Sequence, residues 1–256
     1  MRFGLAASAL AALALASACV RSDTVPARAY PNQPSPHARR DARDDASGAI
    51  APLPAGAHAP TPGLLAPASP HACYDTLWRA GVTFDIVPPE TAPGVQSPLR
   101  LHSGIGGVAI TPRNPSRVHE IIDCRLALRL LAWAPKLRRA GVLRLEHYSI
   151  YRPGARTARR RVSGHAHALA IDAARFHLVT GAVVDVLSDW EDRDRGGHPC
   201  AERPDEAWPS RLLRGVVCDA IAQGLFDVVL TPHHDAAHGN HVHLELRPDV
   251  NWTYVR

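Results

Sequence analysis

The amino-acid sequence predicts an α+β domain with a mainly antiparallel sheet flanked by helices. Two observations lead to this fold class. Apolar residues recur at helical spacing in the early part of the folded region, and segments with strand-like apolar patterns cluster in its later part. No internal repeat is present.

The segment that opens the folded region is expected to form a helix and then a strand. The helix carries Cys73, Leu77 and Trp78 on one side and ends at Gly81. Residues 82–87 then alternate between apolar and polar as a strand does, until two prolines stop the pattern.

The middle of the domain contains the longest predicted helix. Residues 101–110 hold strand-like pieces interrupted by glycines, and the helix follows over residues 118–137. Its apolar side chains, such as Ile121 and Leu128, recur at helical spacing. Pro135 is expected to kink or shorten it, because proline lacks the backbone N–H that a helix interior needs.

The last third of the chain is predicted to consist mostly of strands. One further helix covers residues 210–223 and is closed by Gly224. The strand-like segments are residues 143–150, 168–176, 182–186, 225–230 and 241–246. The second and third of these are expected to form a hairpin that turns at Thr180 and Gly181.

The first nineteen residues have the organisation of an export signal. Arg2 begins a short positive region, residues 3–15 are apolar, and a small-residue cleavage site ends at Ala18. Cys19 follows at once, so the site resembles a bacterial lipobox. We therefore expect a lipid anchor on Cys19, with plain cleavage after Ala18 as the alternative.

Composition and charge limit the classes of protein to consider. With 46% hydrophobic residues the chain cannot be disordered throughout, and no apolar run beyond the N-terminus is long enough to span a membrane. The formal charge of +5 is not accompanied by a motif that reads nucleic acid, so no nucleic-acid partner is expected.

Residues 20–70 are rich in proline and alanine and are interpreted as a disordered tether. Residues 73–256 form the folded domain, which is expected to be a monomer.

The cysteine count agrees with export. Acylation of Cys19 would leave an even four of the five cysteines, and disulfides persist in an oxidising compartment. Four cysteines allow three pairings, and the sequence leaves all three open. Among them we favour Cys73–Cys124 and Cys200–Cys218.

Two segments carry the residue types of a metal site. The first contains His165 and Asp172, and the second, residues 233–243, holds five of the fifteen histidines. His241 and His243 are two apart, so they project from the same face of a strand. His165 and Asp172 are seven apart and can converge only if His165 lies in a loop before the strand that holds Asp172. Two imidazoles and a carboxylate, with one position open for water, are the donor set of a catalytic zinc site. The alternative is a solvated histidine-rich loop.

Both segments match the motifs of known zinc proteins. Ser-x-His-x-x-x-x-Ala-x-Asp at residues 163–172, followed by His-x-His at 241–243, resembles the D-Ala-D-Ala metallopeptidase, lysostaphin and hedgehog group. More closely, the domain resembles the bacterial extensin-like C-terminal family, with further matches around Cys73, around Cys124 and in the tail at 236–243. The resemblance implies a hedgehog- or D,D-peptidase-like fold and a Zn²⁺ ion bound by His165, Asp172 and His243.

The same resemblance implies roles for three more residues. His241 would lie beside the metal as general base or as stabiliser of the oxyanion. The spacing of His238 from His241 is similar to that of the penicillin-insensitive murein endopeptidases, which makes His238 a supporting or catalytic candidate. Arg152 matches the arginine that D,D-peptidases direct at the substrate carbonyl or carboxylate. A structural salt bridge is the alternative for Arg152.

Several positions depart from the related motifs, among them Ile150 and Asp235. Gly164 stands where extensin-like relatives have an acidic residue, and Ala168 stands where the peptidases have glycine. Asn240 occupies the position of the glutamate that carboxypeptidase members use as base. A base in this chain would therefore be a histidine, which favours an endopeptidase over a carboxypeptidase.

These observations together predict an exported, zinc-dependent hydrolase of amide bonds in peptidoglycan peptides. It would be periplasmic or an outer-membrane lipoprotein. Two other functions remain open at this point. One is a zinc-containing cell-wall binding module without catalysis, and the other is a lipoprotein that buffers metal through its histidine-rich tail.

Overall fold

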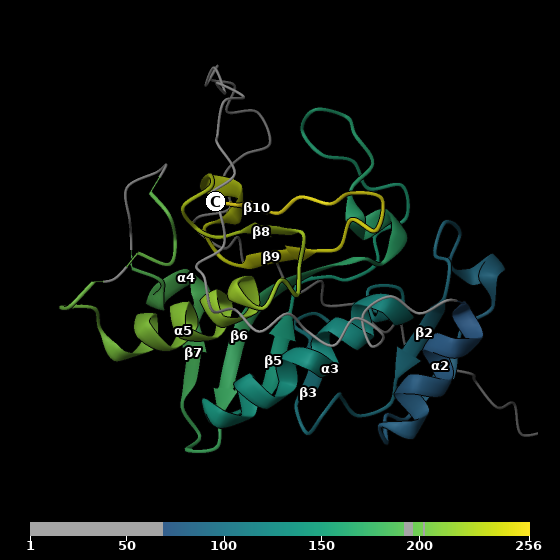
Figure 1. The fold of residues 1–256 in the computed structure, drawn as a ribbon, viewed down its shortest axis with the longest axis horizontal. Helices are drawn as coiled ribbons and strands as arrows, with labels where there is room; N and C mark the ends of the chain where they lie inside the picture. Colours follow the sequence, from purple (N-terminus) through teal and green to yellow (C-terminus); the bar gives the residue numbers. More distant parts are fainter. Residues whose placement is uncertain (1–68, 192–196, 202) are drawn as a thin grey trace, which may run out of the picture. The chain divides into compact units, whose positions relative to one another are not determined.

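The computed structural model describes residues 69–191, 197–201 and 203–256. The predicted signal peptide, Cys19 and nearly all of the predicted tether lie outside the described residues. Within the described part, no helix has the length and apolar character needed to cross a membrane. The predicted fold class is confirmed, because helices flank two sheets whose strands are mostly antiparallel (Figure 1).

The smaller sheet contains three short antiparallel strands. Its order is β1 (Phe84–Ile86), β2 (Pro98–Leu101) and β4 (Ile121–Asp123). The 3₁₀ turn η1 (Pro89–Thr91) lies between β1 and β2 along the chain. Helix α2 (Pro70–Arg79) precedes the sheet and contacts the long helix α3 (Cys124–Arg139).

The larger sheet has the order β10-β8-β9-β6-β5-β3, with β7 also paired to β6. Its strands are β3 (Ala109–Pro112), β5 (Val142–His147), β6 (Ala170–Leu178), β7 (Val183–Asp185), β8 (Val228–Leu230), β9 (Val242–Glu245) and β10 (Tyr254–Val255). The pairs β3–β5 and β8–β10 are parallel and the others antiparallel. The predicted hairpin is confirmed as β6 and β7, which turn through Gly181 at a φ of +85°.

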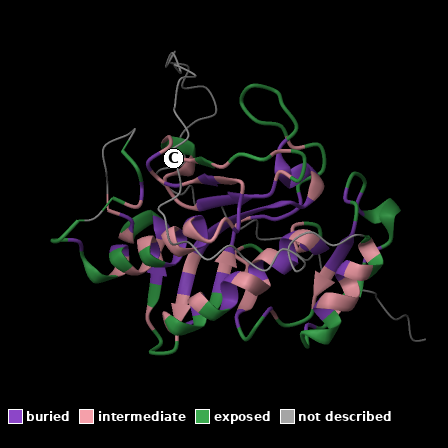
Figure 2. Ribbon diagram, viewed as in Figure 1, coloured by how far each residue is buried: buried purple, intermediate pink, exposed green. Residues whose placement is uncertain are grey.

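The hydrophobic core lies between the larger sheet and its helices. These helices are α3 (Cys124–Arg139), α4 (Val186–Asp189) and α5 (Trp208–Ala222). Trp133 of α3 meets Phe176 of β6 and Phe226 edge to face, and its indole N–H donates to the Val216 carbonyl of α5. Figure 2 shows that β6 and β9 are buried along much of their length.

Both predicted disulfides are present. Cys73–Cys124 joins α2 to the first residue of α3, and Cys200–Cys218 joins the segment before α5 to α5 itself. Both cysteines of the first pair are fully buried in the core.

The predicted long helix begins later than expected. Residues 121–123 form β4, and α3 starts only at Cys124. Asp123 has extended backbone angles, and its carboxylate accepts a hydrogen bond from the Arg125 N–H, as an N-cap residue does. The helix continues through Pro135 to Arg139, so the proline does not shorten it.

Trp78 was predicted to lie on the buried side of its helix, and this prediction is wrong. Its side chain is 75% exposed, whereas Cys73 and Leu77 are buried. Successive helical residues turn by about 100°, so Trp78 lies roughly 140° around the helix from Cys73. Three short elements, β2, α4 and β10, were not predicted because a strand or helix of two to four residues has too little local pattern.

Candidate metal centre

The pairing of β6 with β9 brings two of the candidate ligands together. Asp172 lies directly opposite His243 in the antiparallel register, so the two side chains project from the same face of the sheet. Alternation along β9 adds Glu245 to that face, while Val242 and Leu244 are buried in the apolar core.

A β-bulge in β6 directs Asp172 away from the helices. Consecutive residues of β5 pair with Ala173 and Arg175, so one residue of β6 between them is skipped. Beyond the bulge, Phe176 contacts the α3 side of the sheet. In a regular strand Asp172, four residues earlier, would face the same way. The extra residue reverses the alternation and leaves Asp172 on the opposite face.

His165 comes from a tight turn just before β6. This 3₁₀ turn, η2 (Gly164–His167), begins at Ser163, whose hydroxyl accepts from the His165 N–H. Ala168 ends the turn with a φ of +52°, a conformation that glycine adopts more readily. His165 therefore lies ahead of the strand and Asp172 within it, which is the arrangement that their spacing requires.

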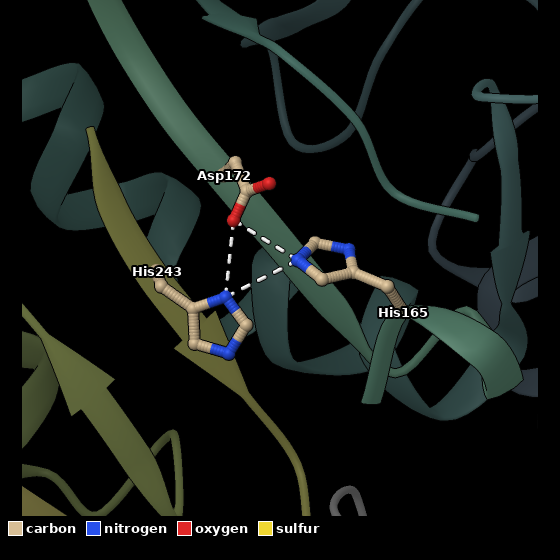
Figure 3. Close-up of side chains that lie close together, drawn as sticks. All are labelled: His165, Asp172 and His243. Carbon is tan, nitrogen blue, oxygen red and sulfur yellow. Dashed lines mark hydrogen bonds and ion pairs between the residues drawn. The ribbon is translucent and has the colours of Figure 1, made fainter. Parts of the chain in front are cut away.

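Three donor atoms converge at this place (Figure 3). His165 Nε2 and His243 Nδ1 each lie 3.0 Å from Asp172 Oδ1, and 3.2 Å from each other. All three residues are buried. Zinc–ligand bonds of about 2.0–2.1 Å place the corners of a tetrahedron about 3.3 Å apart. The donor types and the spacing therefore fit a Zn²⁺ ion.

Each ligand atom is oriented by a hydrogen bond on the far side of its group. The Nδ1–H of His165 donates to the Ile150 carbonyl over 2.8 Å, which leaves Nε2 with its lone pair toward the cluster. His243 Nε2 lies 2.9 Å from Glu245 Oε2. The second carboxylate oxygen of the aspartate accepts from the Ser149 hydroxyl. Such outer contacts are how proteins orient metal ligands.

The electrostatics of the cluster favour positive charge. Burial raises the pKa of Asp172, but the neighbouring imidazoles, above all His165, bring that pKa well below its usual range. Burial lowers the pKa of His243, yet its hydrogen bonds to Asp172 and Glu245 outweigh this and raise that pKa to about 9. Two carboxylates thus lie in a largely buried site, and a divalent cation would neutralise them.

His241 lies next to the three candidate ligands. Its Nε2 is 3.4 Å from Asp172 Oδ1, and its Nδ1 is 2.8 Å from the Asn240 side-chain oxygen. Because an amide oxygen only accepts, Nδ1 carries the proton and Nε2 presents a lone pair to the cluster. Burial lowers the pKa of His241 to about 4. Asn240 thus orients the imidazole.

The other two predicted site residues lie farther out. The ring of His238 is centred 5.2 Å from that of His241 and 6.0 Å from that of His243. The Arg152 guanidinium is 3.9 Å from Asp172 Oδ2 with its side chain 48% exposed. Arg152 therefore marks the solvent side of the cluster.

Glu245 belongs to the site, although no role was predicted for it from the sequence. Its buried carboxylate reaches His243 across a space that exists because residue 164 is glycine. A Cβ on Gly164 would lie 2.6 Å from both Cγ and Cδ of Glu245. The alternation of His243 and Glu245 on one strand face was the signal that could have revealed it.

We expect a Gly164→Ala substitution to weaken zinc binding about 10- to 100-fold. The added methyl group would displace the Glu245 carboxylate and remove the contact that orients His243. Competition with a chromogenic chelator measures the affinity. Gly215→Ala is the matched control, since a Cβ there meets no atom within 4 Å. Equal affinity in the two variants would show that Glu245 does not support the site.

Comparisons with known proteins identify one relationship. The model of the family described as "Extensin-like protein C-terminus" matches residues 71–256, which include the whole cluster and both disulfides. Searches of curated proteins and of solved structures gave no match.

Proposed function

The chain belongs to the extensin-like C-terminal family, and we propose that it is a zinc-dependent hydrolase of amide bonds in peptidoglycan peptides. The observation that carries the proposal is the buried triangle of donor atoms from His165, Asp172 and His243. The substrate class rests on the resemblance of the two motifs to D-Ala-D-Ala metallopeptidases and murein endopeptidases. The disulfides are compatible with an exported protein. A periplasmic or outer-membrane location, with a lipid anchor on Cys19, is part of the proposal.

His165, Asp172 and His243 would hold the zinc ion. Bound zinc supplies a Lewis acid for the scissile carbonyl and lowers the pKa of bound water. The chain contributes the orientation of these three groups through the Ile150 carbonyl, the Ser149 hydroxyl and Glu245.

His241 would move the proton. Its Nδ1–H is engaged by Asn240, so Nε2 can take a proton from the attacking water and return it to the leaving amine nitrogen. The ring of His238 lies beside that of His241 and is placed to exchange the proton with solvent. A histidine base agrees with an endopeptidase, because Asn240 occupies the position of the glutamate that carboxypeptidase members use as base.

Arg152 would bind the substrate. Its 3.9 Å distance to the Asp172 carboxylate exceeds a hydrogen bond, and half of the side chain is exposed. The guanidinium therefore keeps donors for a carbonyl or carboxylate of the wall peptide.

The direct test is cleavage of the cell wall. The purified full chain, loaded with one equivalent of zinc, is incubated with purified sacculi, and released peptides are followed by mass spectrometry. His241→Ala is expected to lower the rate of release about 100-fold, since general base catalysis is lost, while the zinc content stays unchanged. His102→Ala is the control, because this exposed histidine pairs with Asp85 on the smaller sheet.

Other outcomes would identify the rival functions. One zinc per chain and sedimentation with sacculi, but no released peptide, would indicate a cell-wall binding module without catalysis. Several weakly bound ions per chain, with neither sedimentation nor cleavage, would indicate metal buffering.

A further inference from the structure

A second group of two imidazoles and one carboxylate lies in the segment between β8 and β9. His234, Asp235 and His238 each offer one ligand atom, and these atoms all lie within 4.8 Å of one another. We infer that this outer cluster is a second, weaker Zn²⁺ site beside the inner cluster of His165, Asp172 and His243.

Asp235 already lies between the two imidazoles. Its Oδ1 is 2.6 Å from His238 Nδ1, and its Oδ2 is 3.5 Å from His234 Nε2. These two distances, each to a different oxygen of the carboxylate, lie on either side of the spacing of about 3.3 Å expected between ligands of a tetrahedral zinc ion. The three donor atoms, which lie within 4.8 Å of one another, would have to approach to about 3.3 Å to share one ion.

The backbone and the neighbouring rings hold the outer cluster in place. Asp235 caps the 3₁₀ turn η3 (Ala236–His238), accepting from the His238 N–H at 3.0 Å. The His234 ring packs against those of His238 and Tyr254, with centroids 5.2 and 6.3 Å away. Side chains held in this way lose less conformational entropy when they bind an ion.

Exposure and charge explain why the outer cluster binds more weakly. Its side chains are 29%, 45% and 19% exposed for His234, Asp235 and His238, so water can reach the ion and complete its coordination. A single carboxylate offsets only half of the charge of a dication. A second dication would also be repelled by the first, because His238 lies next to His243.

Zinc on the outer cluster would engage His238. That residue could then no longer exchange a proton with His241, so zinc beyond one equivalent is expected to slow cleavage. This consequence, unlike the site itself, rests on the proposed function.

Titration of the metal-free full chain with ZnCl₂, followed by calorimetry and native mass spectrometry, tests the inference. The wild type is expected to bind two ions, the second at least tenfold more weakly. His234→Gln and Asp235→Asn should each weaken only the second event tenfold or more, and asparagine can still cap η3. Asp172→Asn should remove the tight event. His71→Gln, on helix α2, should keep both.

Binding of a single ion up to millimolar zinc would overturn the inference. So would a second event that is unchanged in both outer-cluster variants. A chain that binds zinc only at the outer cluster would support this inference while contradicting the proposed hydrolase, so the two proposals can fail separately.

Discussion

An Asp172→Asn substitution is expected to abolish cleavage of sacculi and to weaken zinc binding at the inner cluster about 100- to 1,000-fold. A four-ligand zinc site is stabilised by about 10–16 kcal/mol, and a quarter of that corresponds to this loss. Asp172 Oδ1 lies 3.0 Å from each of the other two donor atoms, and it brings the negative charge among the three ligands. Chelator competition measures the affinity.

Thermal unfolding provides an independent measurement. Zinc on the inner cluster, at 1,000 times its dissociation constant, should stabilise the wild type by about 4 kcal/mol, and this contribution should fall to about 0.4–1.4 kcal/mol in Asp172→Asn. Asparagine has nearly the same volume, so packing is kept. Asp219→Asn is the control, since that carboxylate pairs with Lys136 on the helices. Zinc binding of wild-type strength in Asp172→Asn would show that the ligand set is wrong and would remove the basis of the hydrolase.

The approach of His165, Asp172 and His243 could be predicted because it follows from short-range rules. Residues seven apart cannot share a face of one strand, so His165 had to precede the strand of Asp172. Alternation placed His241 and His243 on one side. The motif resemblance then indicated that the two distant segments belong to one site.

The contacts that support the cluster could not be predicted in the same way. The bulge that moves the Asp172 side chain to the opposite face of the sheet depends on the register between β5 and β6. This register is determined by pairing between the two strands and not by the sequence of β6 alone. The space beside Gly164 for Glu245 depends on the pairing of β6 and β9. Both are non-local features.

A misassigned segment illustrates the same limit. The spacing from Ile121 to Leu128 fits a helix, but residues 121–123 pair with β2 instead. Pairing with a distant strand supplied their hydrogen bonds and overrode the local pattern. Asp123, an N-cap residue type directly before a helix, was the local signal that marked the true start.

Removal of the Cys73–Cys124 disulfide by a double alanine substitution is expected to lower the free energy of unfolding by about 4 kcal/mol. The bridge closes a loop with a sequence separation of 51, against 18 for Cys200–Cys218. Chain entropy then predicts a loss of about 3 kcal/mol for the second pair. Urea unfolding of the two double variants measures both values.

The two disulfides should differ more in their effect on zinc than on stability. Asp123, which precedes Cys124, donates its backbone N–H to the carbonyl of Ala168 over 3.1 Å, and Ala168 ends the turn that carries His165. Loss of Cys73–Cys124 loosens this connection, so zinc affinity should fall. Loss of Cys200–Cys218, which is anchored on α5, should leave the affinity unchanged. Equal zinc affinities in the two variants would contradict this prediction, because the expected difference depends on the link from β4 to the turn that carries His165.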